Sequence, residues 1–304
     1  MELPHQCTLC PRACRADRAA GHVGYCGADD RLMVARAALH HWEEPCLSGD
    51  PQDRRGSGTV FFSGCSLRCC YCQNYPISQE GVGKAISVQR LADIFLQLQH
   101  DGARNLNLVT ATQYLPWVCE ALDLAKGGGL TLPVVYNTGG YETVETVKAL
   151  QGYVDIWLTD FKYAASDLAA RLSSAADYPV VAEAALRQML RQTGAPAYDA
   201  EGFLRRGVIV RHLALPGCVA DSFAVLQLLA RLRDEEKVSF IPSLMSQFTP
   251  FYKAASQGLG RRITTYEYRK VIEEAIRLGL TDGYMQEKSS ACEEYTPPFD
   301  LEGV

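Results

Sequence analysis

Three cysteines, Cys65, Cys69 and Cys72, have a spacing that suits iron–sulfur chemistry. They form the pattern C-x3-C-x2-C soon after residues 59–62, a β-branched and aromatic run that is typical of a strand. Soft thiolates suit iron–sulfur clusters, and three ligands for four irons leave one iron open to bind and reduce a substrate. Cys70 adjoins Cys69 and is expected to point elsewhere. The alternative is a zinc site made from these cysteines and one further ligand.

A second group of four cysteines lies near the N-terminus. Cys7, Cys10, Cys14 and Cys26 have the spacing C-x2-C-x3-C-x11-C, and the segment around them contains turn-forming glycine and proline. Four thiolates this close in sequence suit a tetrahedral zinc site, and the same four suit a second iron–sulfur cluster. We favour zinc, because nothing in the pattern indicates a second open iron. Unliganded thiols are the remaining alternative.

The composition excludes several classes of protein. The chain has 304 residues, 12 cysteines and a net charge of −5. It is too long and too poor in cysteine for a secreted disulfide scaffold, and too apolar for a disordered chain. The negative charge argues against binding nucleic acid through bulk charge. No uncharged stretch reaches the roughly 18–20 residues that a membrane helix needs, and we see no signal peptide, so we expect a cytoplasmic protein.

Short apolar runs alternate with helical patterns from about residue 56 onward. The runs lie at residues 59–62, 106–110, 133–138, 154–160, 208–211 and 238–242. Helical periodicity follows Leu91 and Val181, Asp221 is a plausible N-cap, and a last helix ends near Gly279. Such alternation implies a parallel sheet, in either a partial barrel or an open doubly wound arrangement. We therefore divide the chain into a Cys-rich segment, residues 1–55, and an α/β unit, residues 56–304.

Polar residues stand at the carboxyl ends of several predicted strands, where α/β folds bind ligands. Asp160 and Lys162 alternate, so both side chains should point to one face with Phe161 on the other. A local ion pair between them is the plainer explanation. Arg211 suits bidentate binding of a carboxylate, or a salt bridge with Asp160. Asn137 and Thr138 either contact a ligand or cap the next helix.

The cysteine loop resembles that of the radical S-adenosylmethionine (SAM) superfamily, with Tyr71 as the aromatic residue before the last cysteine. The resemblance is greatest to glycyl-radical-enzyme activases such as the pyruvate formate-lyase activating enzymes. It rests on Asp160-Phe161-Lys162, on Arg211 ahead of Pro216-Gly217, and on residues 137–140. Residues 61–65, 73–75 and 297–300 are similar to an activase-like subgroup without an established substrate.

The resemblance implies a partial (β/α)6 TIM-type barrel and a [4Fe–4S] cluster on Cys65, Cys69 and Cys72. In that superfamily the open iron chelates SAM, and an electron splits it into methionine and a 5′-deoxyadenosyl radical that abstracts hydrogen. The residues implied in SAM binding are Tyr71, Thr110, Thr112, Asn137, Thr138, Asp160, Lys162 and Arg211. The activases' Gly-Gly-Glu is replaced by residues 109–114, where the threonine hydroxyls or Gln113 would take its role. A histidine that the activases tend to carry is absent from residues 241–247.

The implied partners are a reductant such as flavodoxin or ferredoxin and a substrate that donates hydrogen. That substrate is a glycine of a partner enzyme, a peptide or a small molecule. Cys292 is a candidate to return a hydrogen atom, although an ordinary thiol is the default reading. The rival hypothesis is a non-catalytic iron–sulfur or zinc protein that carries electrons or acts as an interaction scaffold. A carrier needs no barrel, so the repeated strand–helix units argue against it.

Overall fold

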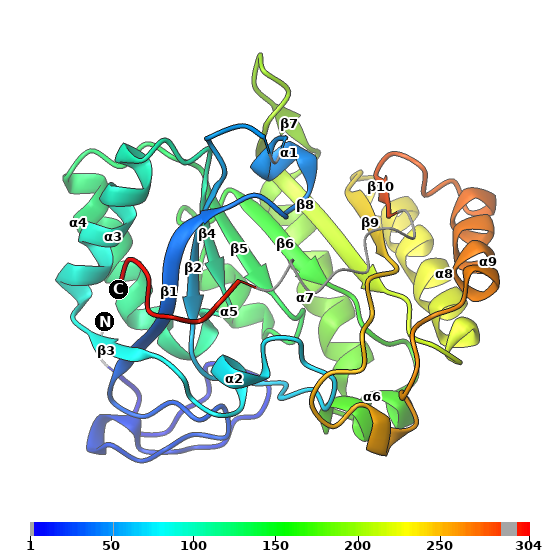
Figure 1. The fold of residues 1–304 in the computed structure, drawn as a ribbon, viewed down its shortest axis with the longest axis horizontal. Coiled ribbons are helices and arrows are strands. Elements are labelled where there is room, and N and C mark those ends of the chain that lie inside the picture. The colour runs from blue at the N-terminus through cyan, green and yellow to red at the C-terminus, as the bar shows by residue number, and fades with distance from the viewer. Residues whose placement is uncertain (1–2, 51, 287–296) are drawn as a thin grey trace.

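The computed structural model describes residues 3–50, 52–286 and 297–304, and one mixed sheet dominates it (Figure 1). The strand order is β10-β9-β8-β6-β5-β4-β2-β1-β3, with β7 attached to β8. From β2 to β10 every neighbouring pair is parallel. These parallel strands are β2 (Ser57–Phe62), β4 (Leu106–Val109), β5 (Val134–Thr138), β6 (Ile156–Asp160), β8 (Leu204–Leu213), β9 (Ile241–Met245) and β10 (Tyr284–Met285).

The order of these strands separates the two predicted architectures. Apart from β7, successive parallel strands along the chain are neighbours in the sheet, whereas a doubly wound sheet reverses its order at a switch point. The two ends of the sheet, β10 and β3, do not pair with each other. The prediction of an α/β partial barrel is therefore confirmed, and the barrel is open.

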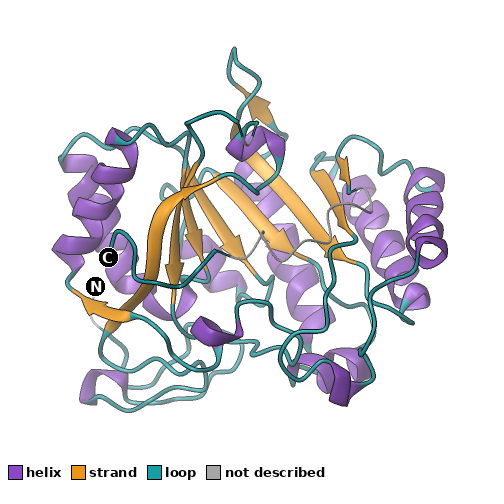
Figure 2. Ribbon diagram, in the orientation of Figure 1, coloured by secondary structure: helices purple, strands orange, loops and turns teal. Residues whose placement is uncertain are grey.

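Helices cover the convex face of the sheet and leave the concave face to loops and short segments (Figure 2). The long connections are α3 (Val88–His100), α4 (Leu115–Gly127), α5 (Val144–Ala149), α6 (Ser166–Ser173), α7 (Tyr178–Thr193), α8 (Val219–Glu236) and α9 (Thr265–Arg277). Short helices are α1 (Pro45–Ser48) and α2 (Tyr75–Ser78), with 3-10 turns at η1 (Arg18–Ala20), η2 (Thr112–Tyr114) and η3 (Ala255–Gln257). Among the helices of the described ranges, none combines the length and apolar character that crossing a lipid bilayer requires.

The central strands are buried on both faces, which explains their continuous apolar runs. Tyr136 and Trp157 pack with the covering helices in the main core. Their neighbours Val135 and Ile156 face a smaller cluster that contains Leu47 of α1. Helix α1 therefore fills the apolar end of the barrel interior, and the rest of the interior is left for a cavity.

The N-terminal part of the chain contributes to the same sheet. Strand β1 (Leu32–His40) runs antiparallel to β2, and β3 (Lys84–Ile86) runs antiparallel to β1. The tail also joins here, because the Ala37 amide donates to the Glu302 carbonyl at 2.9 Å and Arg36 forms ion pairs with Asp300 and Glu302. The short strand β7 (Ala197–Tyr198) forms a hairpin with β8. The division at residue 56 stays a prediction.

Two local predictions were wrong. Strand β9 begins at Ile241 rather than at Val238, because its pairing with β8 starts at Ile209 opposite Ile241. Asp221 is not the N-cap of α8, since the helix begins at Val219 after Cys218. The Asp221 carboxylate instead accepts the backbone amides of Ala164 and Ala165 at 3.1 and 2.7 Å. It thereby holds the loop that leads into α6.

Candidate active site

The cysteine loop follows β2 and is fixed at its first residues by backbone hydrogen bonds. The Gly64 amide donates to the Ile77 carbonyl at 2.8 Å, and the Cys65 amide donates to the Cys26 carbonyl at 3.0 Å. Gly64 has φ +85°, and a Cβ there would lie 2.7 Å from the Cys26 oxygen. Only glycine therefore fits this turn, and it ties the loop to the N-terminal segment.

Each sulfur of the predicted cluster motif accepts a hydrogen bond. The Leu67 amide donates to Cys65 Sγ at 3.4 Å, the Ser78 hydroxyl to Cys72 Sγ at 3.2 Å and the Ser173 hydroxyl to Cys69 Sγ at 3.0 Å. Burial raises the pKa of Cys65 to about 11 and that of Cys72 to about 12. These thiols are therefore protonated at neutral pH in the absence of a metal, and metal binding must displace their protons.

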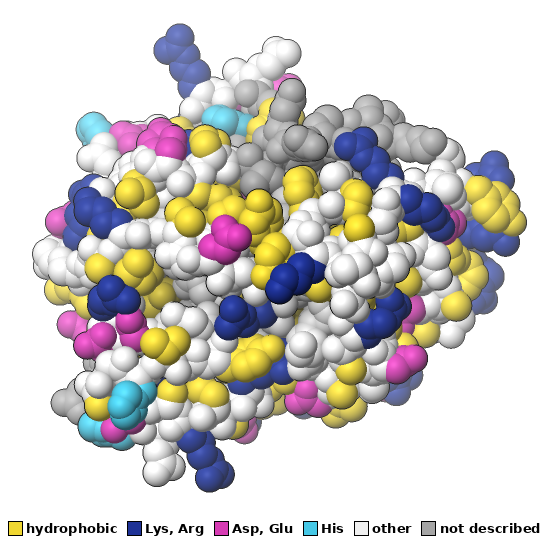
Figure 3. Space-filling view, turned by 60° about the horizontal axis from the view of Figure 1, so that its bottom comes forward, with side chains coloured by type: hydrophobic (Ala, Val, Ile, Leu, Met, Phe, Trp, Pro, Cys, Tyr) yellow, Lys and Arg dark blue, Asp and Glu magenta, His cyan; other side chains and the backbone are white. Residues whose placement is uncertain are grey.

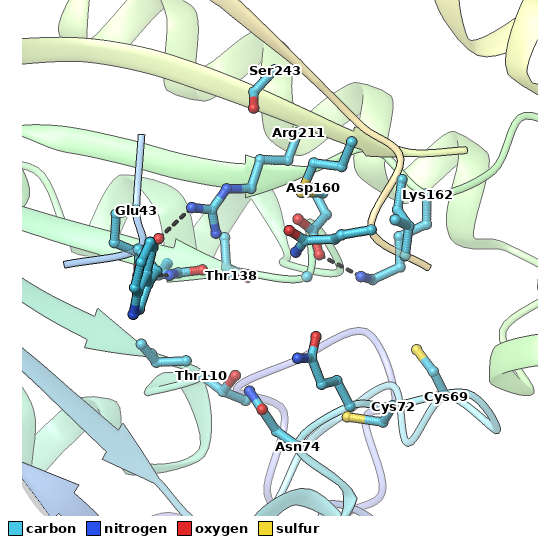
Figure 4. A pocket seen from close by; sticks show the side chains of 18 of the residues that line it. Glu43, Cys69, Cys72, Asn74, Thr110, Thr138, Asp160, Lys162, Arg211 and Ser243 are labelled. Atoms are coloured by element: carbon cyan, nitrogen blue, oxygen red, sulfur yellow. Dashed lines mark hydrogen bonds and ion pairs between the residues drawn. The ribbon is translucent and has the colours of Figure 1, made fainter. Parts of the chain in front are cut away.

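The three cysteines share a cavity with most of the predicted cofactor residues. Its volume is about 350 Å³, within the range of small-molecule sites, and it lies at the carboxyl ends of the parallel strands. Figure 4 shows Cys69 and Cys72 on one side, with Asp160 and Lys162 and then Arg211 and Glu43 beyond them. The lining includes Cys65, Cys69, Tyr71, Cys72, Thr110, Asn137, Thr138, Asp160, Lys162 and Arg211. Thr112 is the predicted cofactor residue that lies elsewhere.

Asp160 and Lys162 both point into this cavity, as their alternation predicted, and they form the ion pair that the plainer explanation predicted. Phe161 packs in the main core on the opposite face. Burial alone would lower the pKa of Lys162, but the Asp160 carboxylate raises it above its usual value. The ammonium is therefore charged, with most of its surface shielded from water.

One alternative predicted a salt bridge between Arg211 and Asp160, and this prediction was wrong. Arg211 instead pairs with two glutamates from the loop before α1. Its Nε and Nη2 donate to Glu44 at 2.7 and 2.6 Å, and Nη2 also contacts Glu43. Asn107 Nδ2 donates to Glu43 Oε1 at 2.9 Å. Burial would raise the pKa of Glu43, but the guanidinium holds it below its ordinary value. This cluster, the ionic floor, contains Glu43, Glu44, Asn107 and Arg211.

Thr138 and Thr112 both form hydrogen bonds with the buried carboxyl group of Glu142. Their hydroxyls donate to Glu142 Oε1 at 2.5 and 2.7 Å. Burial raises the pKa of Glu142 to about 7, although the two threonine hydrogen bonds lower it in part. Asn137 faces the cavity and does not cap the next helix, because Thr143 caps α5.

Gln113 holds the start of the cysteine loop in place through hydrogen bonds from its side chain. Its Nε2 donates to the carbonyls of Ser63, Gly64 and Thr110, at 2.9, 3.1 and 2.7 Å. Thr110 has φ +57°, an uncommon conformation for a β-branched residue, and Gln113 helps to hold it. Thr110 thus lines the cavity while Gln113 fixes the loops around it.

Tyr71 is linked to Cys69 through a chain of hydroxyl groups. Tyr71 lies 2.6 Å from Tyr163, and Tyr163 lies 2.7 Å from Ser173, oxygen to oxygen. Because the single Ser173 proton goes to Cys69 Sγ, Tyr163 must donate to Ser173 and Tyr71 to Tyr163. The phenol of Tyr71 therefore positions a predicted cluster ligand, and one side of the residue lines the cavity.

The N-terminal cysteines are also brought together. Cys7, Cys10, Cys14 and Cys26 line a second cavity of only about 10 Å³, with Thr112 and Ser66 in its wall. Within the described ranges, no three His, Cys, Asp or Glu side chains are already arranged as ligands of one metal ion. Cys292 lies outside the described residues.

Sequence reasoning missed the roles of four acidic or amide residues. From the sequence alone, Glu43 and Glu44 belong to a polar and aromatic stretch, residues 40–44, that either faces a substrate or forms an exposed linker, and only the fold shows that they are buried against Arg211. The sequence does mark two of them as unusual. Asn107 interrupts the apolar strand β4, and Glu142 closely follows the Asn137–Gly140 turn. Pattern alone does not reveal which partners these groups meet.

Comparison with known proteins finds partial likenesses, and no family model matches the chain. An uncharacterized protein of Methanocaldococcus jannaschii is 28% identical over 285 residues, which is 90% of this chain and 75% of that protein. Among solved structures, a methylornithine synthase (PylB) aligns over 73% of this chain with 14% identity and a TM-score of 0.47. The structure of anSMEcpe with bound AdoMet aligns over 73% with 11% identity and a TM-score of 0.46. The chain spans 60% and 61% of these two structures.

Proposed function

We propose that this chain is a radical SAM enzyme that cleaves S-adenosylmethionine reductively and abstracts hydrogen from a substrate. One observation carries the proposal. The three cysteines of C-x3-C-x2-C share one cavity with the Asp160–Lys162 pair and Arg211, at the carboxyl ends of parallel strands. A structural metal site needs no cavity beside it, whereas a catalytic site requires room for reactants.

The residues present fit a [4Fe–4S] cluster. Cys65, Cys69 and Cys72 offer three soft sulfur ligands from one loop, and the cavity borders all three. When bound, the cluster with its open iron supplies the electron that splits SAM into methionine and a 5′-deoxyadenosyl radical. Ser173, Ser78 and the Leu67 amide hold the three sulfurs in place through hydrogen bonds.

The cavity offers distinct groups for the polar parts of SAM. The Lys162 ammonium suits a carboxylate, and the Asp160 carboxylate suits ribose hydroxyls or an amino group. Asn137 and Thr110 add neutral polar groups to the cavity wall. Arg211 is already held by two carboxylates, so we assign it to positioning the ionic floor rather than to binding the SAM carboxylate.

The substrate that loses hydrogen is a glycine of a partner enzyme, as in the activases, or a peptide or small molecule. The carboxylates of Glu43, Glu44 and Asp160 outnumber the cations Arg211 and Lys162 in the cavity. This surplus supports a bound reactant with a positively charged group.

The required electron comes from a carrier such as flavodoxin or ferredoxin, in the cytoplasm. Arg68 and Lys253 are exposed beside the cysteine loop. Figure 3 shows that Lys and Arg side chains are mixed with Asp and Glu side chains over the face turned forward there. The two cations beside the cysteine loop support docking of an acidic carrier, even though the whole chain is negatively charged.

The decisive experiment measures 5′-deoxyadenosine after anaerobic reconstitution with iron and sulfide, followed by dithionite and SAM. We expect release from the wild type and a loss of at least roughly a hundredfold in Cys69→Ala, because a cluster ligand is missing. Cys70→Ala is the matched control and should retain release, since Cys70 is not in the cavity wall. Equal release from Cys69→Ala would refute the cluster assignment. An iron-loaded wild type that never releases 5′-deoxyadenosine would favour the non-catalytic electron carrier.

A further inference from the structure

The four N-terminal cysteines surround a space of atomic size. The cavity that they share has a volume of about 10 Å³, close to the space that a single water molecule needs. A Cβ placed on Gly24 would be in van der Waals contact with both Cys26 Sγ, at 3.4 Å, and Cys14 Sγ, at 3.5 Å, so these two sulfurs lie near one another. One metal ion fits such a space, whereas the four irons and four sulfides of a cubane do not.

Backbone hydrogen bonds turn the chain around these cysteines. The Cys7 amide donates to the Ala16 carbonyl at 3.1 Å, and the Arg15 amide donates to the Cys7 carbonyl at 3.0 Å. The Ala13 amide donates to the Cys10 carbonyl at 3.0 Å. The turns that present Cys7 and Cys10 are therefore held by the backbone itself.

A buried cation beside the cavity lacks an anionic partner. Arg18 is fully buried, lines the cavity and donates only to backbone carbonyls, those of Asp29 and Gln113. No carboxylate among the described residues forms an ion pair with it. A buried charge without a counter-charge is costly. Four thiolates around a divalent metal would carry a net charge of −2 and supply that counter-charge at the place where Arg18 lies.

We propose that Cys7, Cys10, Cys14 and Cys26 bind one structural Zn²⁺ ion as a tetrathiolate, and that this site fixes the loop that carries Cys65. Zinc prefers tetrahedral sulfur ligation, and its binding displaces the four thiol protons. The first part of the proposal is independent of radical chemistry, whereas the second rests on the proposed function.

The connection between the two cysteine groups consists of direct contacts. Cys26 presents its carbonyl to the Cys65 amide, and Ser66 lies in the wall of the small cavity. Arg12, next to the first two ligands, donates to the Ser66 carbonyl at 2.8 Å. In the opposite direction, Arg68 Nη1 donates to the Tyr25 carbonyl at 3.1 Å. A metal that holds residues 7–26 therefore also fixes residues 65–68.

Metal content of the full-length chain tests the zinc site. The variant Cys65→Ala/Cys69→Ala/Cys72→Ala, purified without oxygen, should retain about one equivalent of zinc per chain. Exchange of that zinc for Co²⁺ should give the intense visible bands of tetrahedral cobalt–thiolate. Cys14→Ser, at an exposed ligand, should lose the metal, and Cys70→Ser should keep it. Iron and sulfide in the triple variant, or no bound metal, would overturn the proposal.

Iron incorporation tests the connection. Zinc-free Cys14→Ser should bind several-fold less iron at Cys65, Cys69 and Cys72 than Cys70→Ser does, with a lower thermal midpoint. If Cys14→Ser loses zinc but binds iron as well as the wild type, the positioning role is wrong and the zinc site stands. If the wild type never releases 5′-deoxyadenosine, the proposed function fails, and the zinc content of the triple variant still decides the first part.

Discussion

The backbone amide of Cys65 donates to the carbonyl oxygen of Cys26 at 3.0 Å, which joins the two cysteine groups of the chain. The contact exists because Gly64 turns with φ +85° and has no Cβ to strike that oxygen. Residues nearly 40 positions apart in sequence thus meet at the start of the proposed cluster loop. The N-terminal segment is therefore part of the scaffold of the candidate active site.

Replacing Gly64 with alanine should damage this junction. The new Cβ would lie 2.7 Å from the Cys26 oxygen, in a conformation that alanine also disfavours. We expect a destabilisation of about 1–3 kcal/mol and reduced iron incorporation, measured by denaturant unfolding and iron analysis. Gly81→Ala is the matched control, because Gly81 has φ +73° but no atom near the added Cβ. If both variants lose the same stability and both bind iron normally, the steric conflict at Gly64 is not important.

Much of the scaffold was predictable from the sequence. The strands β4, β5 and β6 are buried on both faces, so each is a short apolar run, and the polar residues that end β6 mark the carboxyl edge. The two-residue period of a strand predicts that Asp160 and Lys162 point to the same face. The rule that α/β sheets bind ligands at their carboxyl edge predicts that both lie at the site.

Partners distant in sequence were not predictable. Arg211 lies 167 positions from Glu44, and no local pattern indicates that a loop before α1 reaches into the barrel. Thr112 was expected at the SAM site because it follows β4, yet the 3-10 turn η2 directs its hydroxyl to Glu142. Such tertiary pairings depend on how the loops fold over the sheet.

Lys162 should contribute to SAM affinity. Lys162→Met removes the ammonium that we assign to the SAM carboxylate, and hydrogen bonds to charged groups are worth about 1.5–3 kcal/mol, or roughly ten- to a hundredfold in dissociation constant. Anaerobic equilibrium dialysis with labelled SAM measures the change on iron-loaded protein. Lys270 on α9 is half-buried and lies outside the cavity, so Lys270→Met is the control and should bind SAM normally. Unchanged affinity in Lys162→Met would remove this residue from the binding site.

The ionic floor should stabilise the fold, because Arg211 is buried together with Glu43 and Glu44, so that the buried carboxylates keep a cation beside them. Arg211→Met leaves Glu43 and Glu44 buried without their cation, and we expect a loss of about 3–5 kcal/mol in the free energy of unfolding. The surface pair Arg31–Asp29 provides the comparison, and Arg31→Met should cost less than about 1 kcal/mol. Chemical denaturation measures both. Adding Glu43→Gln and Glu44→Gln to Arg211→Met should restore part of the loss, and failure to do so would contradict the charge argument.

Glu142 should make stability depend on pH in an unusual direction. Burial raises the folded-state pKa of this carboxyl group from 4.5 to about 7, so the folded chain binds a proton that the unfolded chain has released between these values. Stability from this group is complete below pH 4.5 and is lost as the pH rises toward 7, which is opposite to the usual carboxylate. Glu142→Gln cannot ionise and keeps an oxygen for Thr138 and Thr112.

The free energy of unfolding of Glu142→Gln, relative to the wild type, should therefore rise between pH 5 and pH 7.5 by about 2–3 kcal/mol. Denaturant titrations of both proteins across this range measure the difference, and other titrating groups cancel in the comparison. Glu145→Gln, at the start of the neighbouring helix α5, should show no such trend. A difference that stays constant with pH would mean that Glu142 ionises at its ordinary pKa, in which case its two threonine hydrogen bonds, rather than burial, dominate its environment.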